Sequence, residues 1–166
     1  MNRYEPETLE LSDLSPEAMY ELFEKNAWGD GLPLVPPTKE RVEGMLAFAT
    51  GDPDEVITTL LPRAGIVTRR VVAINAVLAG CPPVVFPVVL SAIRALARPE
   101  VNIRGVNATT HLVAPLVIVH GEIVARAGFN AGVGAFGPGN RANATVGRAV
   151  RLILLHVAGA RPGFGA

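Results

Sequence analysis

The amino-acid sequence predicts a single α+β domain in which about five helices pack on a small mixed or antiparallel sheet. A length of 166 residues is enough for one hydrophobic core without disulfides or metal staples. Apolar residues recur at helical spacing between Ala142 and Val157, which is typical of a buried helix face. β-Branched residues gather in shorter runs at 56–61 and 112–119, which favours strands.

Capping residues mark the ends of the predicted helices. Ser15 followed by Pro16 is typical of a helix start, and Thr38 and Thr68 fit the same capping role. Gly80 can end one helix, and the prolines after it can begin the next. These signals predict helices over 15–26, 38–49, 68–79, 84–97 and 140–157.

Strands are predicted where apolar and β-branched residues form short runs. One strand is expected at 56–61 and another at 101–106. The near-continuous apolar run 112–119 predicts a central strand, and a tight turn after it leads into 122–127, so these two segments predict a hairpin. The domain is expected over residues 15–158, between an acidic N-terminal arm, 1–14, and a flexible C-terminal tail, 159–166.

Composition and charge narrow the classes of partner. The formal net charge is zero and no basic stripe is interleaved with aromatic residues, so nucleic acid is not expected. Hydrophobic residues make up 49% and charged residues 18%, and this apolar balance predicts contact with a second polypeptide, further copies of the chain, or both. The N-terminus has no signal-peptide core and no apolar run reaches membrane-spanning length, so we expect a cytoplasmic protein with no membrane partner.

The glycine-rich segment 128–139 and the helix after it form the most informative stretch. Arg141, Thr145 and Arg148 share one helix face near the helix start, where unpaired N–H groups and the helix dipole favour an anion. The alternative is a tight structural turn, because neither the Rossmann fingerprint nor a P-loop is present. If the loop binds a ligand, the expected contacts come from Gly139, Asn140, Arg141, Asn143 and Thr145.

Three residues are candidates for catalytic chemistry. Cys81 is expected at or beside the start of the helix 84–97, where the pKa of a thiol is lowered; the alternative is a small buried hydrophobe. His111 follows the polar residues 107–110 and can act as acid, base or hydrogen-bond donor. Asp30 is either a site carboxylate or a cap for N–H groups in a packed connector. No metal site is expected, because the three histidines lack i, i+4 spacing and there is one cysteine.

Four stretches together resemble a poorly characterised bacterial family. They are WGDGLPLVPPT at 28–38, VVAINAVLAGC at 71–81, NATTHLVAPLVIVHGEI at 107–123 and FGPGNRANATVGRAVRLIL at 136–154. Members of that family are often discussed with the UGSC cysteine or selenocysteine proteins. They continue into a second half after the arginine-rich helix, and they carry proline where this chain has Leu112. The resemblance therefore implies an N-terminal half whose partner is a C-terminal-half or UGSC-type polypeptide.

The expected function is a subunit of a cysteine-dependent small-molecule enzyme of hydrolase, lyase or thiol-transfer type. Cys81 would be the nucleophile and His111 the base, while the segment 137–145 would hold an anionic or carbonyl oxygen. One alternative is a non-catalytic subunit that binds an anionic small molecule and completes a partner chain's active site; another is a purely structural half. The sequence leaves the cofactor unknown. The candidate catalytic residues are Cys81, His111 and Asp30, and the candidate substrate-binding residues are Trp28, Asn107, Thr109, Thr110, Gly139, Asn140, Arg141, Asn143 and Thr145.

These hypotheses require different geometries. The enzyme requires an accessible Cys81 close to His111 or Arg141. The binding subunit permits a buried Cys81 but needs Arg141 and Arg148 to face a cavity. The structural half predicts that both arginines pair with acids such as Asp30 or Glu122.

Overall fold

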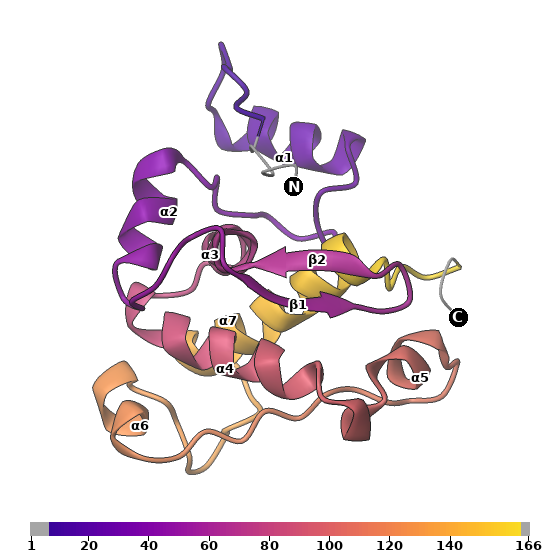
Figure 1. Ribbon diagram of the computed structural model, residues 1–166. Helices are drawn as coiled ribbons and strands as arrows, with labels where there is room; N and C mark the ends of the chain where they lie inside the picture. The colour runs from indigo at the N-terminus through magenta and orange to yellow at the C-terminus, as the bar shows by residue number, and fades with distance from the viewer. Residues whose placement is uncertain (1–6, 164–166) are drawn as a thin grey trace.

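The α+β class is confirmed by the computed structural model, in which residues 7–163 are described. Among these residues the structure has seven α-helices and one two-stranded antiparallel sheet, so helices dominate (Figure 1). No helix of the described chain is both long and apolar enough to cross a membrane. The elements are α1 (Pro16–Lys25), α2 (Lys39–Leu46), β1 (Val56–Leu60), β2 (Gly65–Thr68), α3 (Arg69–Leu78), α4 (Phe86–Leu96), α5 (Ile103–Ala108), α6 (Glu122–Ala127) and α7 (Arg141–Ile153).

All five predicted helices form, and the predicted caps start three of them. The side chains of Ser15, Thr38 and Thr68 accept hydrogen bonds from backbone N–H groups in the first turns of α1, α2 and α3. Asn140 caps α7 in the same way. Local side-chain chemistry therefore decides where these helices begin.

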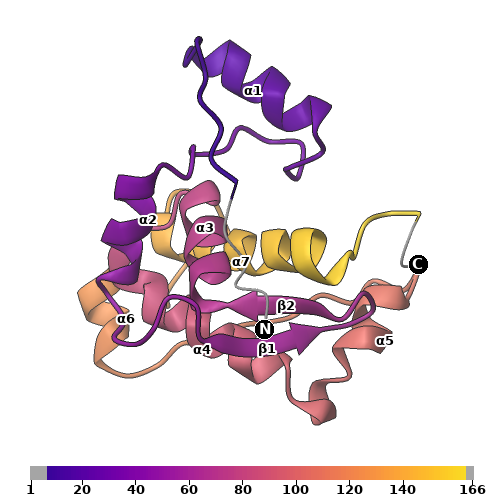
Figure 2. The same cartoon turned by 45° about the horizontal axis from the view of Figure 1, so that its top comes forward.

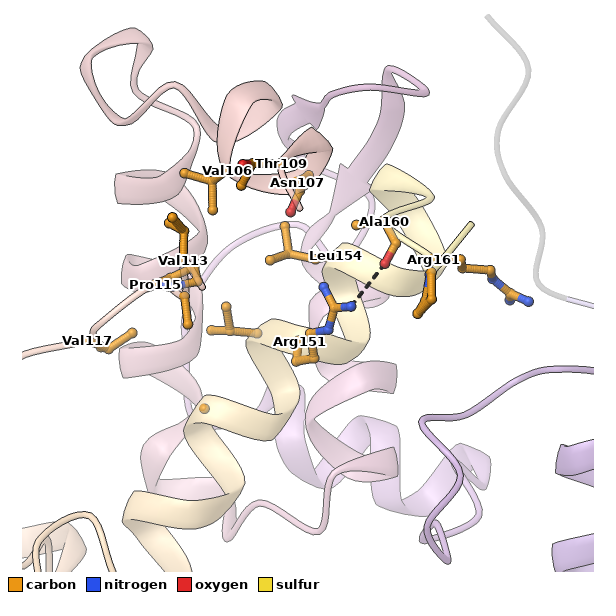
Figure 3. A pocket seen from close by; sticks show the side chains of 14 residues that line it. Val106, Asn107, Thr109, Val113, Pro115, Val117, Arg151, Leu154, Ala160 and Arg161 are labelled. Carbon is orange, nitrogen blue, oxygen red and sulfur yellow. Dashed lines mark hydrogen bonds between the residues drawn. The ribbon is translucent and has the colours of Figure 1, made fainter. Parts of the chain in front are cut away.

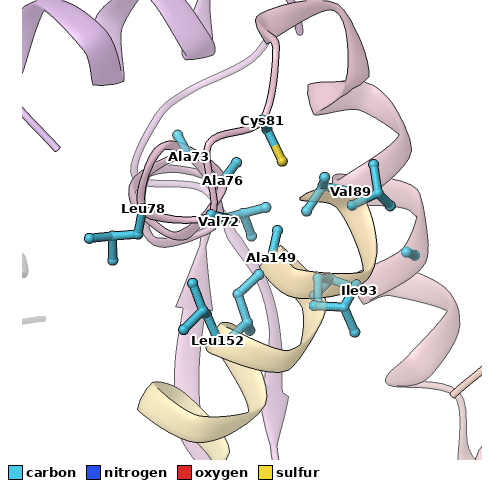
Figure 4. Packing of buried hydrophobic residues seen from close by; sticks show 14 of the residues in the cluster. Val72, Ala73, Ala76, Leu78, Cys81, Val89, Ile93, Ala149 and Leu152 are labelled. Atoms are coloured by element: carbon cyan, nitrogen blue, oxygen red, sulfur yellow. The ribbon is translucent and has the colours of Figure 1, made fainter. Parts of the chain in front are cut away.

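The core lies where α3, α4 and α7 meet. Val72 of α3, Ile93 of α4 and Leu152 of α7 are completely buried, and Figure 4 shows them converging between the three helices. Two fully buried alanines, Ala76 and Ala149, permit close approach of the helices that carry them. Helix α1 stands apart from this bundle in both views of the ribbon (Figures 1 and 2).

The sheet packs against the end of α7. Strands β1 and β2 form an antiparallel hairpin, and α7 continues as one π-helical stretch, Leu154–Ala158, that contacts both strands. A side chain at Gly65 would collide with the backbone oxygen of Val157, so glycine is required at this close approach. The chain stays packed beyond the helix, because Ala160 is buried and Arg161 donates to the Ala27 carbonyl at 2.6 Å. Parts of the predicted arm, 1–6, and tail, 164–166, lie outside the described residues.

Two predicted strands are helices instead. The segment 101–106 contributes to α5, because Asn102 adopts a left-handed conformation and its side chain accepts from the Gly105 N–H as a helix cap. The segment 122–127 is α6 and lies between Gly121 and Gly128. Gly128 adopts a left-handed conformation, as Asn102 does. The β-branched residues predicted strands wrongly here, since the Asn102 cap at the start of α5 and the left-handed Gly128 at the end of α6 favour helices over a weak strand preference.

The prediction of a central strand at 112–119 is also wrong. This segment is extended and irregular, and it crosses from α5 to α6 beneath α4 (Figure 1). Residues 122–127, its expected hairpin partner, form α6, so among the described residues no strand pairs with it. Within residues 7–163, its only backbone–backbone hydrogen bond joins the Val113 N–H to the His111 carbonyl. Residues 112–119 are called the extended segment below.

Alanine substitutions at two glycines should change stability in opposite directions. Gly147 lies inside α7 and Gly128 is the left-handed cap of α6, and both have open space where a Cβ would go. Gly147→Ala should raise the free energy of unfolding by about 0.5–1 kcal/mol because alanine favours the helix. Gly128→Ala should lower it by about 1 kcal/mol because of its positive φ. Urea denaturation measures both, and equal effects of the same sign would contradict the assigned backbone conformations.

Candidate functional site

The structure separates the three candidate catalytic residues. Within residues 7–163, no hydrogen bond or ion pair joins any two of Cys81, His111 and Asp30. No group of three histidine, cysteine, aspartate or glutamate side chains in the described chain is arranged to hold a metal ion. His111 and Thr110 are exposed at the start of the extended segment, and the His111 N–H donates to the Thr109 hydroxyl at 3.1 Å. The arrangement does not assemble a nucleophile–base pair.

Asp30 pairs with Arg148 and joins the loop after α1 to α7. The Arg148 Nε and Nη2 atoms donate to the two carboxylate oxygens at 2.8 and 2.9 Å, and Nη2 also donates to the Pro33 carbonyl at 2.9 Å. The Arg148 hydrogen bonds hold the pKa of Asp30 below its usual range, although burial opposes them. Trp28 in the same loop packs edge-on against Phe23, with ring centroids 6.3 Å apart. Arg148 therefore meets the expectation of the structural hypothesis.

Cys81 is buried rather than exposed at a helix start. Helix α4 begins at Phe86, after a 3₁₀ turn at Pro83–Val85 that follows Cys81 and Pro82. Its Sγ atom donates to the Thr145 carbonyl of α7 at 3.4 Å. Burial raises the pKa of Cys81 to about 11, although the positive charge of Arg141 opposes this shift. The expected lowering of this pKa is wrong, because loss of hydration outweighs the nearby positive charge.

The asparagines of the loop between α6 and α7 hold the loop itself. The Asn143 amide donates to the carbonyls of Asn130 and Ala135, both at 2.9 Å, and accepts from the Asn130 N–H at 3.0 Å. Asn140 caps α7 and donates to the Gly128 carbonyl at 2.7 Å. Gly139 has a positive φ of 100°. These polar groups, expected as ligand contacts, are engaged in ordering the loop.

Arg141 keeps unused donors. Its Nε atom donates to the Gly80 carbonyl at 2.9 Å, next to Cys81, while Nη1 and Nη2 have no hydrogen-bond partner among the described residues. The side chain is exposed at the first position of α7. Thr145 does not extend this site, because its hydroxyl donates to the Arg141 carbonyl at 2.7 Å. Of the two arginines in the predicted anion cradle, only Arg141 can therefore receive an anion.

A cavity of about 460 Å³ lies between α7 and the extended segment (Figure 3). Two predicted binding residues, Asn107 and Thr109, line it. Sequence reasoning missed its α7 wall, formed by Gly147, Arg151 and Leu154. Their i, i+4, i+7 spacing was the available signal, since residues at this spacing share one helix face. The cavity is separate from Cys81 and from Arg141, neither of which lines it.

Alkylation should find Cys81 inert in the folded chain. A thiol pKa of about 11 and an exposed fraction of 4% leave little reactive thiolate at neutral pH. The rate with iodoacetamide at pH 7.5 should be at least about a hundredfold below that of free cysteine, whose pKa is about 8.5. Mass spectrometry measures the rate, and the same chain in urea is the control that should react freely. Rapid native labelling with an inflection below pH 8.5 would contradict the buried thiol.

Asp30→Asn should lower the free energy of unfolding by about 1–2 kcal/mol, because it leaves a half-buried arginine without its carboxylate. Glu100→Gln is the control: its pair with Arg98 is exposed, so no change is expected. The folded state lowers the pKa of Asp30, so its stabilisation is present above the ordinary carboxyl pKa of about 4 and is lost as pH falls below it. Urea denaturation at pH 7 and pH 3 should show the wild-type advantage shrinking in acid.

No protein-family model, no curated protein and no solved structure matches this chain. The resemblance to the bacterial family carried by the four motifs stays a prediction.

Proposed function

We propose that this chain is a non-catalytic subunit that binds an anionic small molecule through Arg141 and completes the active site of a partner chain. The observation that carries the proposal is a set of large apolar side chains held in solvent. Leu112 is 100% exposed, and Leu116 and Ile118 are 65% and 79% exposed. Val133 and Phe136, on the asparagine-ordered loop, are almost fully exposed as well. These five residues are called the outer apolar residues below.

Such exposure favours an interface over a surface that faces water. Single exposed apolar residues are ordinary, but Leu112, Leu116 and Ile118 lie within one extended segment, and apolar residues grouped on a monomer mark contact sites. Val133 and Phe136 sit on a loop whose backbone is tied by Asn130 and Asn143, so collapse onto the core would break those hydrogen bonds. A partner surface that covers the outer apolar residues would remove them from water without that cost.

Arg141 supplies the anion contact that a partner's site would use. Two of its nitrogen atoms lack partners among the described residues, and it stands at the start of a thirteen-residue helix, where the dipole favours negative charge. The N–H groups of a guanidinium suit carboxylate and phosphate oxygens equally, so either anion fits. The partner we expect is a second polypeptide of the C-terminal-half or UGSC type, with a second copy of the chain as the alternative.

The cysteine-dependent hydrolase, lyase or thiol-transfer function has less support from the geometry. It requires the Cys81 thiol to reach a substrate and a base, whereas the thiol is buried under α7 and lies against the Thr145 carbonyl. That function stays a prediction which needs a different arrangement of the Gly80–Cys81 turn.

Sedimentation velocity tests the docking part of the proposal. The chain, purified from the cells that make it naturally, should sediment as a defined complex larger than one subunit. The double substitution Leu116→Asp and Phe136→Asp should release the folded monomer, because it places charge on residues already in water in the single chain. A wild-type chain that is monomeric, with a variant that behaves identically, would refute the docking.

Calorimetric titration of the assembled complex with inorganic phosphate and with acetate tests the anion part. Arg141→Gln should weaken binding of at least one of these anions by about tenfold or more, which corresponds to the loss of one charge-assisted contact. Arg104→Gln is the matched control, since Arg104 is an exposed arginine on α5 with no ion pair in the described chain. Equal affinities for wild type and Arg141→Gln would remove Arg141 from the site.

A further inference from the structure

The cavity between α7 and the extended segment has the size and the walls of a small-molecule site. Its volume of about 460 Å³ falls within the range of ligand pockets in proteins, roughly 300–1,000 Å³. Its lining comes from α5, the extended segment, α7 and the C-terminal residues. Figure 3 shows Val113 and Pro115 on one side of it and Leu154 and Arg151 of α7 on the other.

Most of the cavity wall is apolar and none of it is acidic. The apolar lining residues include Val106, Val113, Val117, Val150 and Leu154. The polar side chains are few, and no aspartate or glutamate lines the cavity. A pocket that is mainly apolar with a small number of placed polar groups is the usual form of a binding site for organic molecules.

Arg151 provides the charge in this apolar setting. Its Nη2 atom donates to the Ala160 carbonyl at 3.1 Å, which holds the guanidinium on the α7 side of the cavity (Figure 3). Arg151 has no ion pair in the described chain, and its other N–H donors make no hydrogen bond there. Arg161 also lines the cavity, but its guanidinium donates to the Ala27 carbonyl and points away. One cationic group is therefore available to a ligand.

We propose that this cavity binds a small monocarboxylate with a compact aliphatic or aromatic body, whose carboxylate pairs with Arg151. The body would lie against the valines, and a planar guanidinium matches the two oxygens of a carboxylate. A dianion such as phosphate fits less well, because one arginine would leave a second negative charge uncompensated beside apolar walls. The side chains of Asn107 and Thr109 lie at the α5 end, where they can contact a polar substituent.

This site is distinct from the anion contact proposed at Arg141. Arg141 is in the first turn of α7 and does not line the cavity, whereas Arg151 is ten residues further along the helix. The cavity is formed within one chain, so binding to it needs no partner subunit. Loss of anion binding at Arg141 would therefore not contradict carboxylate binding in the cavity, and the reverse also holds.

Calorimetric titration of the full-length chain with benzoate and with 3-methylbutanoate tests the proposal, with benzamide and inorganic phosphate as comparison probes. At least one carboxylate should bind, and benzamide and phosphate should bind about tenfold more weakly or not at all. Arg151→Gln should weaken carboxylate binding by about tenfold or more, and Arg151→Lys should weaken it less. Arg104→Gln, at an exposed arginine that does not line the cavity, should leave it unchanged.

A pair of helical glycines separates loss of the site from loss of the fold. Gly147 lines the cavity and Gly44 lies in α2 away from it, and neither has an atom near the place of a Cβ. Gly147→Leu should fill the cavity and block carboxylate binding without lowering the free energy of unfolding, because leucine favours a helix. Gly44→Leu should leave the affinity unchanged. Absence of binding by both carboxylates, equal binding of benzamide and benzoate, or full affinity in Gly147→Leu would each overturn the proposal.

Discussion

The burial of one face of α7 against α3 and α4 is the interaction on which the rest of the structure depends. Ala149 and Leu152 are completely buried on that face, and the end of the helix also supports the β-hairpin. Because this face is fixed, the other faces of α7 point in fixed directions. Arg148 is brought to Asp30, and the Thr145 carbonyl covers Cys81. Hydrophobic packing of one helix thus decides which polar groups meet.

Most of the polar residues that look functional in the sequence stabilise this arrangement. Asn143 and Asn140 bind backbone groups of the glycine-rich loop, and Asp30 pairs with Arg148. A buried or half-buried polar group must find partners within the fold, so such residues are engaged by their neighbours. Two arginines of α7, Arg141 and Arg151, each use one nitrogen in a hydrogen bond to a backbone carbonyl and keep further donors unused in the described chain. These unused donors distinguish the two candidate sites from polar residues that only stabilise the fold.

The extended segment contributes residues both to the proposed interface and to the proposed carboxylate cavity. Val113 and Val117 line the cavity, and Leu112, Leu116 and Ile118 are the most exposed of the segment's large apolar residues. The segment is extended, in keeping with its β-branched sequence, although no strand pairs with it in the described chain. Pro115 lacks an N–H, so only one edge of the segment can form an uninterrupted ladder. A partner chain that covers the outer face would also immobilise the wall of the cavity.

The sequence by itself determined the five longer helices, the caps of three of them and the α+β class, because capping and helical periodicity act over a few residues. It also located the loop before α7. Only the tertiary structure decided that Cys81 is buried, that Asp30 belongs to Arg148, and that Arg151 faces a cavity. It also decided that 101–106 and 122–127 coil while 112–119 remains unpaired. Burial, ion pairing and strand pairing depend on residues far apart in the chain, and short-range pattern carries no information about which of them meet.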